Sequence, residues 1–133
     1  MRDILFRGKR IDNSEWAFGS LLIGRTATFI WNNPEVFAKD IDRSTVGQYT
    51  GLTDKNGKKI FEGDIIKIVP DYDYSDDYSI SKVYSYNGIL CVDYHGDDFD
   101  STALGFLDDY LPDGDFEVIG NIHDNPELLE VTK

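Results

Sequence analysis

The chain has 133 residues and a mass of 15.1 kDa, the size of about one ordinary domain. Its 25 acidic against 13 basic side chains give a formal net charge of −12, which disfavours direct binding to nucleic acid or to an anionic membrane. One cysteine excludes a disulfide within the chain, two histidines cannot complete a cysteine-rich zinc site, and no apolar run is long enough to span a membrane. We expect a globular, cytoplasmic protein.

Short runs rich in β-branched and aromatic residues, bounded by Gly, Asn, Asp or Pro, follow one another along the chain and predict strands. The first two runs predict a hairpin of residues 4–11 and 16–23. Further strands are predicted at residues 26–31, 65–69, 82–86, 89–94 and 116–122. The predicted fold is therefore mainly β, a small barrel-like or two-sheet architecture with one or two short helical turns.

Asparagine and glycine mark the turns between these strands. Asn87 and Gly88 tolerate the positive φ angles of a type I′ turn, so they predict a two-residue hairpin loop. The polar residues 53–58 predict a second turn that ends in Asn-Gly. Gly63 predicts a third turn, directly before the strand at residues 65–69.

Two short helical turns are predicted in the C-terminal half. Residues 102–111 carry leucines at helical spacing, although a glycine within them weakens the pattern. Asn125 before Pro126 is typical of a helix start, because Asn caps the first turn and Pro has no N–H to leave unpaired.

Among the apolar residues, Trp16, Phe18 and Trp31 lie at strand period and are predicted to serve the core. Cys91 lies within a predicted strand, and a buried structural thiol is favoured over a nucleophile.

Charge divides the chain in two. Residues 1–70 carry 11 basic and 9 acidic side chains, a net of +2, whereas residues 71–133 carry 2 basic and 16 acidic ones, a net of −14. This asymmetry points to interaction surfaces. The tract at residues 70–78 alternates acids and tyrosines, a composition that favours an exposed, unstructured loop. The alternative is a recognition surface, because tyrosine offers a large contact area at a low entropic cost. Its candidate binding residues are Asp71, Tyr72, Asp73, Tyr74, Asp76 and Asp77.

Catalytic motifs are largely missing from the sequence. It contains no glycine-rich phosphate loop and no serine in a nucleophile-elbow context. His95, Asp97 and His123 have the order of a two-histidine-one-carboxylate metal site, with Asp93 as a further nominal ligand. The alternative places His95 in a surface turn and His123 in a C-terminal loop. We assign no catalytic residue and expect no cofactor.

Three blocks of sequence, residues 1–10, 46–66 and 116–129, together resemble the YopX family, small proteins encoded by phages and prophages. Nothing in residues 70–112 contributes to this resemblance. The resemblance implies one domain over residues 1–133 and a β-rich accessory protein in the cytoplasm of the host bacterium. It implies neither a reaction nor a cofactor. Within that domain the sequence allows two β lobes, residues 1–59 and an acidic lobe of residues 60–133.

The central block supplies a second set of candidate binding residues, and its turns leave a purely structural role open as the alternative. These candidates are Gln48, Tyr49, Lys55, Asn56 and Gly57. Gly63 and Asp64 before residues 65–69 also resemble the start of an SH3-like barrel, which is an analogy of fold only.

These observations favour a non-enzymatic accessory protein that binds a host or phage protein, with the acidic half mimicking nucleic acid as a sharper version. Two alternatives stay open. The first is a metal-assisted hydrolase or nuclease that uses the carboxylate and histidine residues. The second is a homo-oligomer in which the acidic half of one copy meets the weakly basic half of another.

Overall fold

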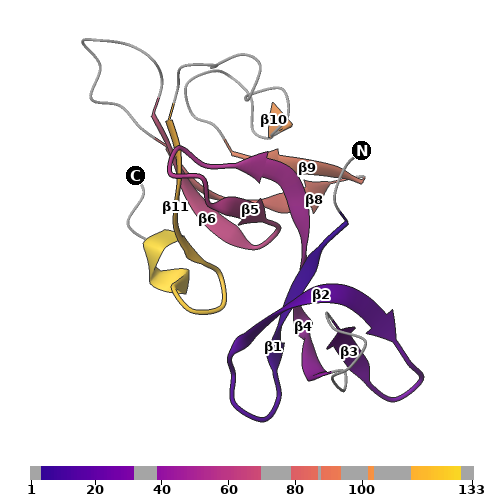
Figure 1. Cartoon of the computed structure of the whole chain (residues 1–133). Helices are drawn as coiled ribbons and strands as arrows, with labels where there is room; N and C mark the ends of the chain where they lie inside the picture. Colours follow the sequence, from indigo (N-terminus) through magenta and orange to yellow (C-terminus); the bar gives the residue numbers. More distant parts are fainter. Residues whose placement is uncertain are drawn as a thin grey trace. The chain divides into compact units, whose positions relative to one another are not determined.

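The computed structural model describes residues 4–31, 39–69, 79–86, 88–93, 102–103 and 115–129. These residues are mainly β, as the sequence predicts (Figure 1). The strands are β1 (Phe6–Arg10), β2 (Trp16–Ile23), β3 (Thr28–Trp31), β4 (Lys39–Thr53), β5 (Lys59–Phe61), β6 (Asp64–Val69), β7 (Ser79–Lys82), β8 (Tyr84–Tyr86), β9 (Ile89–Val92), β10 (Thr102–Ala103) and β11 (Asp115–Asn121). One short 3-10 helix, η1 (Pro126–Leu129), follows β11.

The chain divides into two compact units, Met1–Gly51 and Leu52–Lys133. We call them the N-unit and the C-unit and describe each by itself. β4 runs through the boundary, so its last two residues belong to the C-unit.

The strands of the N-unit close into a ring. Antiparallel pairs join β1 to β2, β2 to β3, β3 to β4, and β4 back to β1. Figure 1 shows these strands in indigo and purple. In a closed arrangement, alternate residues of each strand point inward and outward.

The inside of the ring is narrow. A Cβ atom placed on Gly8 would lie 2.5 Å from Cγ2 of Ile41 and 3.3 Å from Cδ1 of Ile30. Both isoleucines are buried. Ala17 lies directly opposite Gly8, so small residues of β1 and β2 face each other on this inner side. The bulky residues that alternate with them must therefore point outward.

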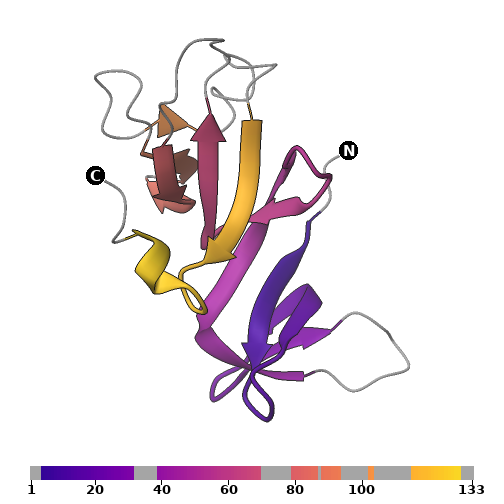
Figure 2. The same ribbon diagram turned by 90° about the vertical axis from the view of Figure 1, so that its left-hand side faces the viewer.

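The C-unit contains two three-stranded antiparallel sheets, in the orders β11-β6-β7 and β10-β9-β8. Figure 2 shows β6 and β11 side by side, in agreement with their long antiparallel register. Large aliphatic residues form a nearly continuous run along β6, and Ile65, Ile66 and Ile68 are fully buried, so both faces of this central strand are covered. The core cluster consists of Ile60, Ile66, Ile68, Val83, Val92 and Phe116.

The predicted turns of the C-unit are confirmed. Gly57, Gly63 and Gly88 all have positive φ angles, 81°, 94° and 81°, which glycine adopts without a steric penalty. Tyr86 pairs with Ile89, which leaves the predicted two-residue loop between β8 and β9. The hairpin of β1 and β2 in the N-unit is confirmed as well.

Two local predictions need correction. Thr102 and Ala103 form strand β10, not the start of a helical turn, because they pair with β9; the rest of that predicted turn lies outside the described residues. The predicted strand at residues 82–86 is interrupted at Val83, whose N–H donates to the Asp64 carbonyl. The short helical turn predicted at Asn125 and Pro126 is confirmed as the 3-10 helix η1.

The sequence did not predict most of β4, because its mainly polar composition lacks the apolar pattern that is typical of a strand.

Cys91 is buried, as predicted. Within the described ranges, no helix combines the length and the apolar character that crossing a lipid bilayer requires.

Candidate functional site

The outward side of the ring carries a row of large apolar side chains. Residues directly opposite each other in a sheet share a face. Ser20 lies opposite Trp31 and Leu22 opposite Phe29, and Trp16, Phe18, Ser20 and Leu22 alternate along β2. We call the surface formed by Trp16, Phe18, Leu22, Phe29 and Trp31 the aromatic face.

The aromatic face is open to solvent over most of its length. Phe18 is 43% exposed, Leu22 44% and Trp31 37%, whereas Trp16 and Phe29 are half-buried. The prediction that Trp16, Phe18 and Trp31 serve the core is therefore wrong for Phe18 and Trp31. The physical reason is the crowded interior at Gly8 and Ala17, which places the side chains alternating with Ala17 on the outer side, where Trp31 lies opposite Ser20.

Two cations stack on the half-buried tryptophan of this face. The guanidinium carbon of Arg7 lies 4.5 Å from the centroid of the Trp16 ring. Nζ of Lys9 lies 5.4 Å from it. Both distances are within the range in which the quadrupole of an indole attracts a cation. Arg7 is only 6% exposed, so the cation loses most of its contact with water and the stack gains in strength.

Acidic side chains balance these cations. Asp42 lies opposite Lys9 across β1 and β4, and Asp40 lies opposite Phe29 across β3 and β4. Each aspartate therefore belongs to the same outward side of the ring as the aromatic face. With Arg7 and Lys9 they bring the formal charge of this side close to zero.

A pocket of about 430 Å³ lies where the turn after β1 meets the start of β4. Its lining consists of Lys9, Arg10, Ile11, Ser14, Ile41, Asp42 and Arg43. Ser14 has a φ of 61°, in the left-handed region, and its N–H donates to the Arg10 carbonyl to close the turn.

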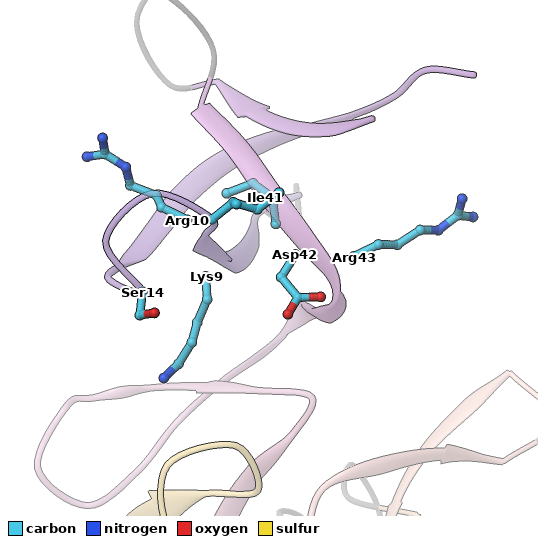
Figure 3. A pocket seen from close by; sticks show the side chains of 7 residues that line it. Lys9, Arg10, Ser14, Ile41, Asp42 and Arg43 are labelled. Carbon is cyan, nitrogen blue, oxygen red and sulfur yellow. The ribbon is translucent and has the colours of Figure 1, made fainter. Parts of the chain in front are cut away.

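The cations of this pocket do not converge on one point. Figure 3 shows the guanidinium groups of Arg10 and Arg43 extending in opposite directions. Arg10 binds Asp12 through two hydrogen bonds, Nε to Oδ1 at 3.0 Å and Nη2 to Oδ2 at 2.7 Å. Oδ1 of Asp42 accepts from the N–H and the hydroxyl of Ser44. The pocket thus has mixed charge and lacks the clamp that a tightly held anion requires.

Two of the predicted binding residues lie in β4 of the N-unit. Gln48 pairs with Phe6, and the N–H of Tyr49 donates to the Leu5 carbonyl at 2.8 Å. Both side chains are half-buried. Their role in binding stays a prediction.

The other described candidates, Lys55, Asn56 and Gly57, form the exposed turn between β4 and β5. Its organising residue is Asp54, which the sequence analysis did not single out. Oδ1 of this buried carboxylate accepts from the N–H groups of Asn56 and Lys58, both at 2.9 Å. Oδ2 accepts from the N–H of Val118 at 3.0 Å and so ties the turn to β11.

Opposing effects act on the pKa of Asp54. Burial alone would raise the pKa of this carboxyl. The hydrogen bonds from the backbone N–H groups of Val118, Lys58 and Asn56, together with the charge of Lys58, outweigh burial and lower the pKa below its ordinary value of 3.8. Asp54 is therefore held as a carboxylate, and its geometry explains the conspicuous Asp-x-Asn-Gly turn on structural grounds.

The remaining predictions fall mostly outside the described residues. These residues are Asp71, Tyr72, Asp73, Tyr74, Asp76 and Asp77 of the acidic tract and His95 and Asp97 of the metal alternative. His123 lies in the turn after β11, where its N–H donates to Oδ1 of Asn121. Asp93 accepts a hydrogen bond from the Tyr84 hydroxyl at 2.7 Å. Among the residues with a described position, no group of three His, Cys, Asp or Glu could hold a metal ion.

Comparison with known proteins agrees with the blocks of sequence noted above. The chain is 38% identical over 79 residues to the SPbeta prophage-derived uncharacterized protein YopX of Bacillus subtilis (strain 168). That alignment covers 58% of this chain and 54% of the relative, so it spans about half of the relative's length.

Two crystal structures share the fold. Protein EF1440 from Enterococcus faecalis is 26% identical, with a TM-score of 0.60 over 97% of this chain and 99% of the other. Protein yopX from Bacillus subtilis is 23% identical, with a TM-score of 0.62 over 94% and 97% of the two chains, and this likeness concerns the fold alone. The family described as YopX protein matches residues 6–130, nearly the whole chain. The chain therefore belongs to the YopX family.

Proposed function

We propose that this chain is a phage-encoded accessory protein that binds another protein, of host or phage, without catalysing a reaction on it. The observation that carries the proposal is the aromatic face, where Phe18, Leu22 and Trp31 are each more than a third exposed. Exposed tryptophan and phenylalanine side chains that regular strands hold in place are typical anchors of protein interfaces. The phage origin rests on the name of the Bacillus relative, which is prophage-derived.

The closed ring favours recognition through side chains over strand addition. β1 and β3 have a paired neighbour on both sides, whereas β2 pairs with β1 through residues 16–19 and with β3 through residues 20–23. An added peptide strand therefore finds only short unpaired segments of β2 among these pairings. The aromatic face is presented by regular β-strands, which hold its rings in fixed positions and lower the entropic cost of binding.

Affinity capture with matched variants tests the proposal. The bait is the full chain, used in lysates of phage-infected or lysogenic cells, beside a double variant Phe18→Ser with Trp31→Ser. Ile89→Ser is the control, because Ile89 is an exposed apolar residue of the C-unit, 54% exposed. Far-UV circular dichroism of all three proteins establishes that the fold is retained.

We expect a captured protein that, once purified, binds the wild type and Ile89→Ser equally. The double variant should lose more than about tenfold in affinity, because interface tryptophans commonly dominate binding. The proposal is wrong if no protein is enriched above background, or if the purified partner binds the folded double variant as tightly as the wild type.

A further inference from the structure

Cation–π contacts are already present on this side of the N-unit sheet. Arg7 and Lys9 both lie against one indole ring, 4.5 Å and 5.4 Å from its centroid. The arginine is the closer of the two, and its flat guanidinium suits stacking on a ring better than an ammonium does. The stack of Arg7 on Trp16 is therefore an intramolecular example of the contact that an arginine of a partner protein could make with an aromatic side chain of this surface.

The exposed part of the aromatic face offers the same kind of surface to a partner. Trp31 and Phe18 lie on adjacent strands, with Ser20 opposite Trp31 and two residues from Phe18. Asp40 is exposed and pairs with Phe29, so it is a diagonal neighbour of Trp31. Diagonal neighbours across a strand pair lie about 7–8 Å apart, which long side chains bridge. A cation stacked on Trp31 would therefore have a carboxylate within reach.

The charge of this protein indicates the net charge that a binding partner should carry. The outward side of the ring is close to neutral, since Arg7 and Lys9 are balanced by Asp40 and Asp42. The chain as a whole carries a formal net charge of −12, which lies in residues 71–133, whereas residues 1–70 carry a net of +2. A negative net charge accelerates the approach of basic proteins and opposes nucleic acid.

The geometry points to a basic partner protein that lays an arginine side chain on the surface of Phe18 and Trp31, with its guanidinium beside Asp40. This inference deepens the proposed function and rests on it. It assigns the partner's chemistry: an arginine-bearing, partly apolar segment, whose aliphatic residues would cover Leu22. The mixed-charge pocket beside Lys9 takes no part in it.

Peptide binding measured by fluorescence anisotropy tests the inference without the natural partner. The probe is a blocked, dye-labelled peptide of alternating arginine and leucine. Otherwise identical peptides carry lysine, or the neutral arginine isostere citrulline, and a labelled oligothymidylate is the nucleic-acid arm. Wild type is compared with Trp31→Leu, which keeps apolar area but removes the ring, with Asp40→Asn, and with Ile89→Ala as the control.

We expect the arginine peptide to bind more tightly than the lysine peptide and far more tightly than the citrulline peptide. Trp31→Leu should weaken the arginine peptide about two- to fivefold and abolish its advantage over lysine. Asp40→Asn should weaken both cationic peptides, and Ile89→Ala neither. Phe18→Leu provides a second test should Trp31→Leu fail to fold.

Two results would overturn the inference. One is equal binding of the arginine peptide to wild type and to folded Trp31→Leu, which would place the peptide on acidic residues elsewhere. The other is oligothymidylate binding that depends on Trp31 and exceeds that of the arginine peptide, which would make the face a nucleic-acid surface. A captured protein partner that is not basic would leave the proposed function standing while this inference falls. Failed capture with intact peptide selectivity would count against the proposed function, and would leave only the preference of the aromatic face for arginine.

Discussion

The two units of this protein use apolar residues in opposite ways. The C-unit buries Ile60, Ile65, Ile66, Ile68 and Val92 almost completely. The N-unit buries Ile30 and Ile41 but exposes six other large apolar side chains of its described residues: Ile4, Ile11, Phe18, Leu22, Ile23 and Trp31. Of the large exposed apolar residues with a described position, all but Ile89 belong to the N-unit. The C-unit thus contains the better-buried apolar core, whereas the N-unit presents an exposed apolar surface.

The largest expected effect is in the C-unit core. Ile66→Ala removes a fully buried side chain from the core cluster and should lower the free energy of unfolding by about 4 kcal/mol. Leu22→Ala, on the aromatic face of the N-unit, should change it by less than about 1 kcal/mol. Urea unfolding followed by far-UV circular dichroism measures both, and similar losses would contradict the division between the two units.

The second effect concerns Asp54. Asp54→Ala leaves the N–H groups of Asn56, Lys58 and Val118 without their acceptor and should cost about 3 kcal/mol of stability. Asp54→Asn keeps one acceptor oxygen and should cost less. The same urea titrations provide the measurement. An alanine variant as stable as wild type would mean that other groups organise this turn.

The same carboxylate predicts a dependence on pH. Because its pKa is lower in the folded protein than in the unfolded chain, its contribution is fully present above the unfolded value of 3.8. The contribution is lost as the pH falls below 3.8 and through the folded pKa. Stability measured between neutral pH and strongly acid pH should therefore fall less steeply for Asp54→Asn than for wild type. Parallel curves would show that other carboxyl groups dominate acid unfolding.

The N-unit ring can be tested at its tightest point. Gly8→Ala places a Cβ atom 2.5 Å from Cγ2 of Ile41 and should destabilise the N-unit by about 2 kcal/mol through overpacking. Adding Ile41→Ala removes the clashing atom, so the double variant should be more stable than the sum of the single losses predicts. Fluorescence of Trp16 and Trp31, the two tryptophans of the chain, reports unfolding of this unit. Strict additivity of the two losses would argue against a narrow ring.

The smallest effect is expected at the turn between β1 and β2. Ser14 has a φ of 61°, which costs an L-residue with a side chain some strain that glycine avoids. Ser14→Gly should stabilise the N-unit by up to about 1 kcal/mol, since glycine's greater freedom in the unfolded chain offsets part of the gain. A rise in the thermal midpoint by tryptophan fluorescence would confirm it, and a fall would indicate that the Ser14 side chain stabilises the turn.

Much of the local structure was visible in the sequence. Asn87 and Gly88 predicted the hairpin loop, because few residues tolerate positive φ, and the run of β-branched residues at 65–69 predicted strand β6. β4 was largely missed, because a strand that mixes polar and charged residues with few large apolar ones lacks the usual signal. Only its pairing with both β1 and β3 makes it a strand.

The aromatic face marks the limit of sequence reasoning. The sequence shows that Trp16 and Phe18 alternate with the small residues Ala17 and Gly19. Alternation alone does not say which face of a strand is buried. A useful signal was the small residues themselves, since Ala17 and Gly8 suit a crowded interior. If Ala17 and Gly8 face the interior of the ring, the bulky side chains that alternate with Ala17 must lie on its outer side.

By itself, the amino-acid order determined the β class, the turns and the family, because these depend on local backbone preferences and on blocks of residues that survive in relatives. Only the tertiary structure decided that the first four strands close into a ring and that Trp31 and Phe18 lie outside it. The physical reason is that inside and outside are properties of the closed sheet. They follow from how closely Gly8 and Ile41 approach across it, not from the hydrophobicity of any one residue.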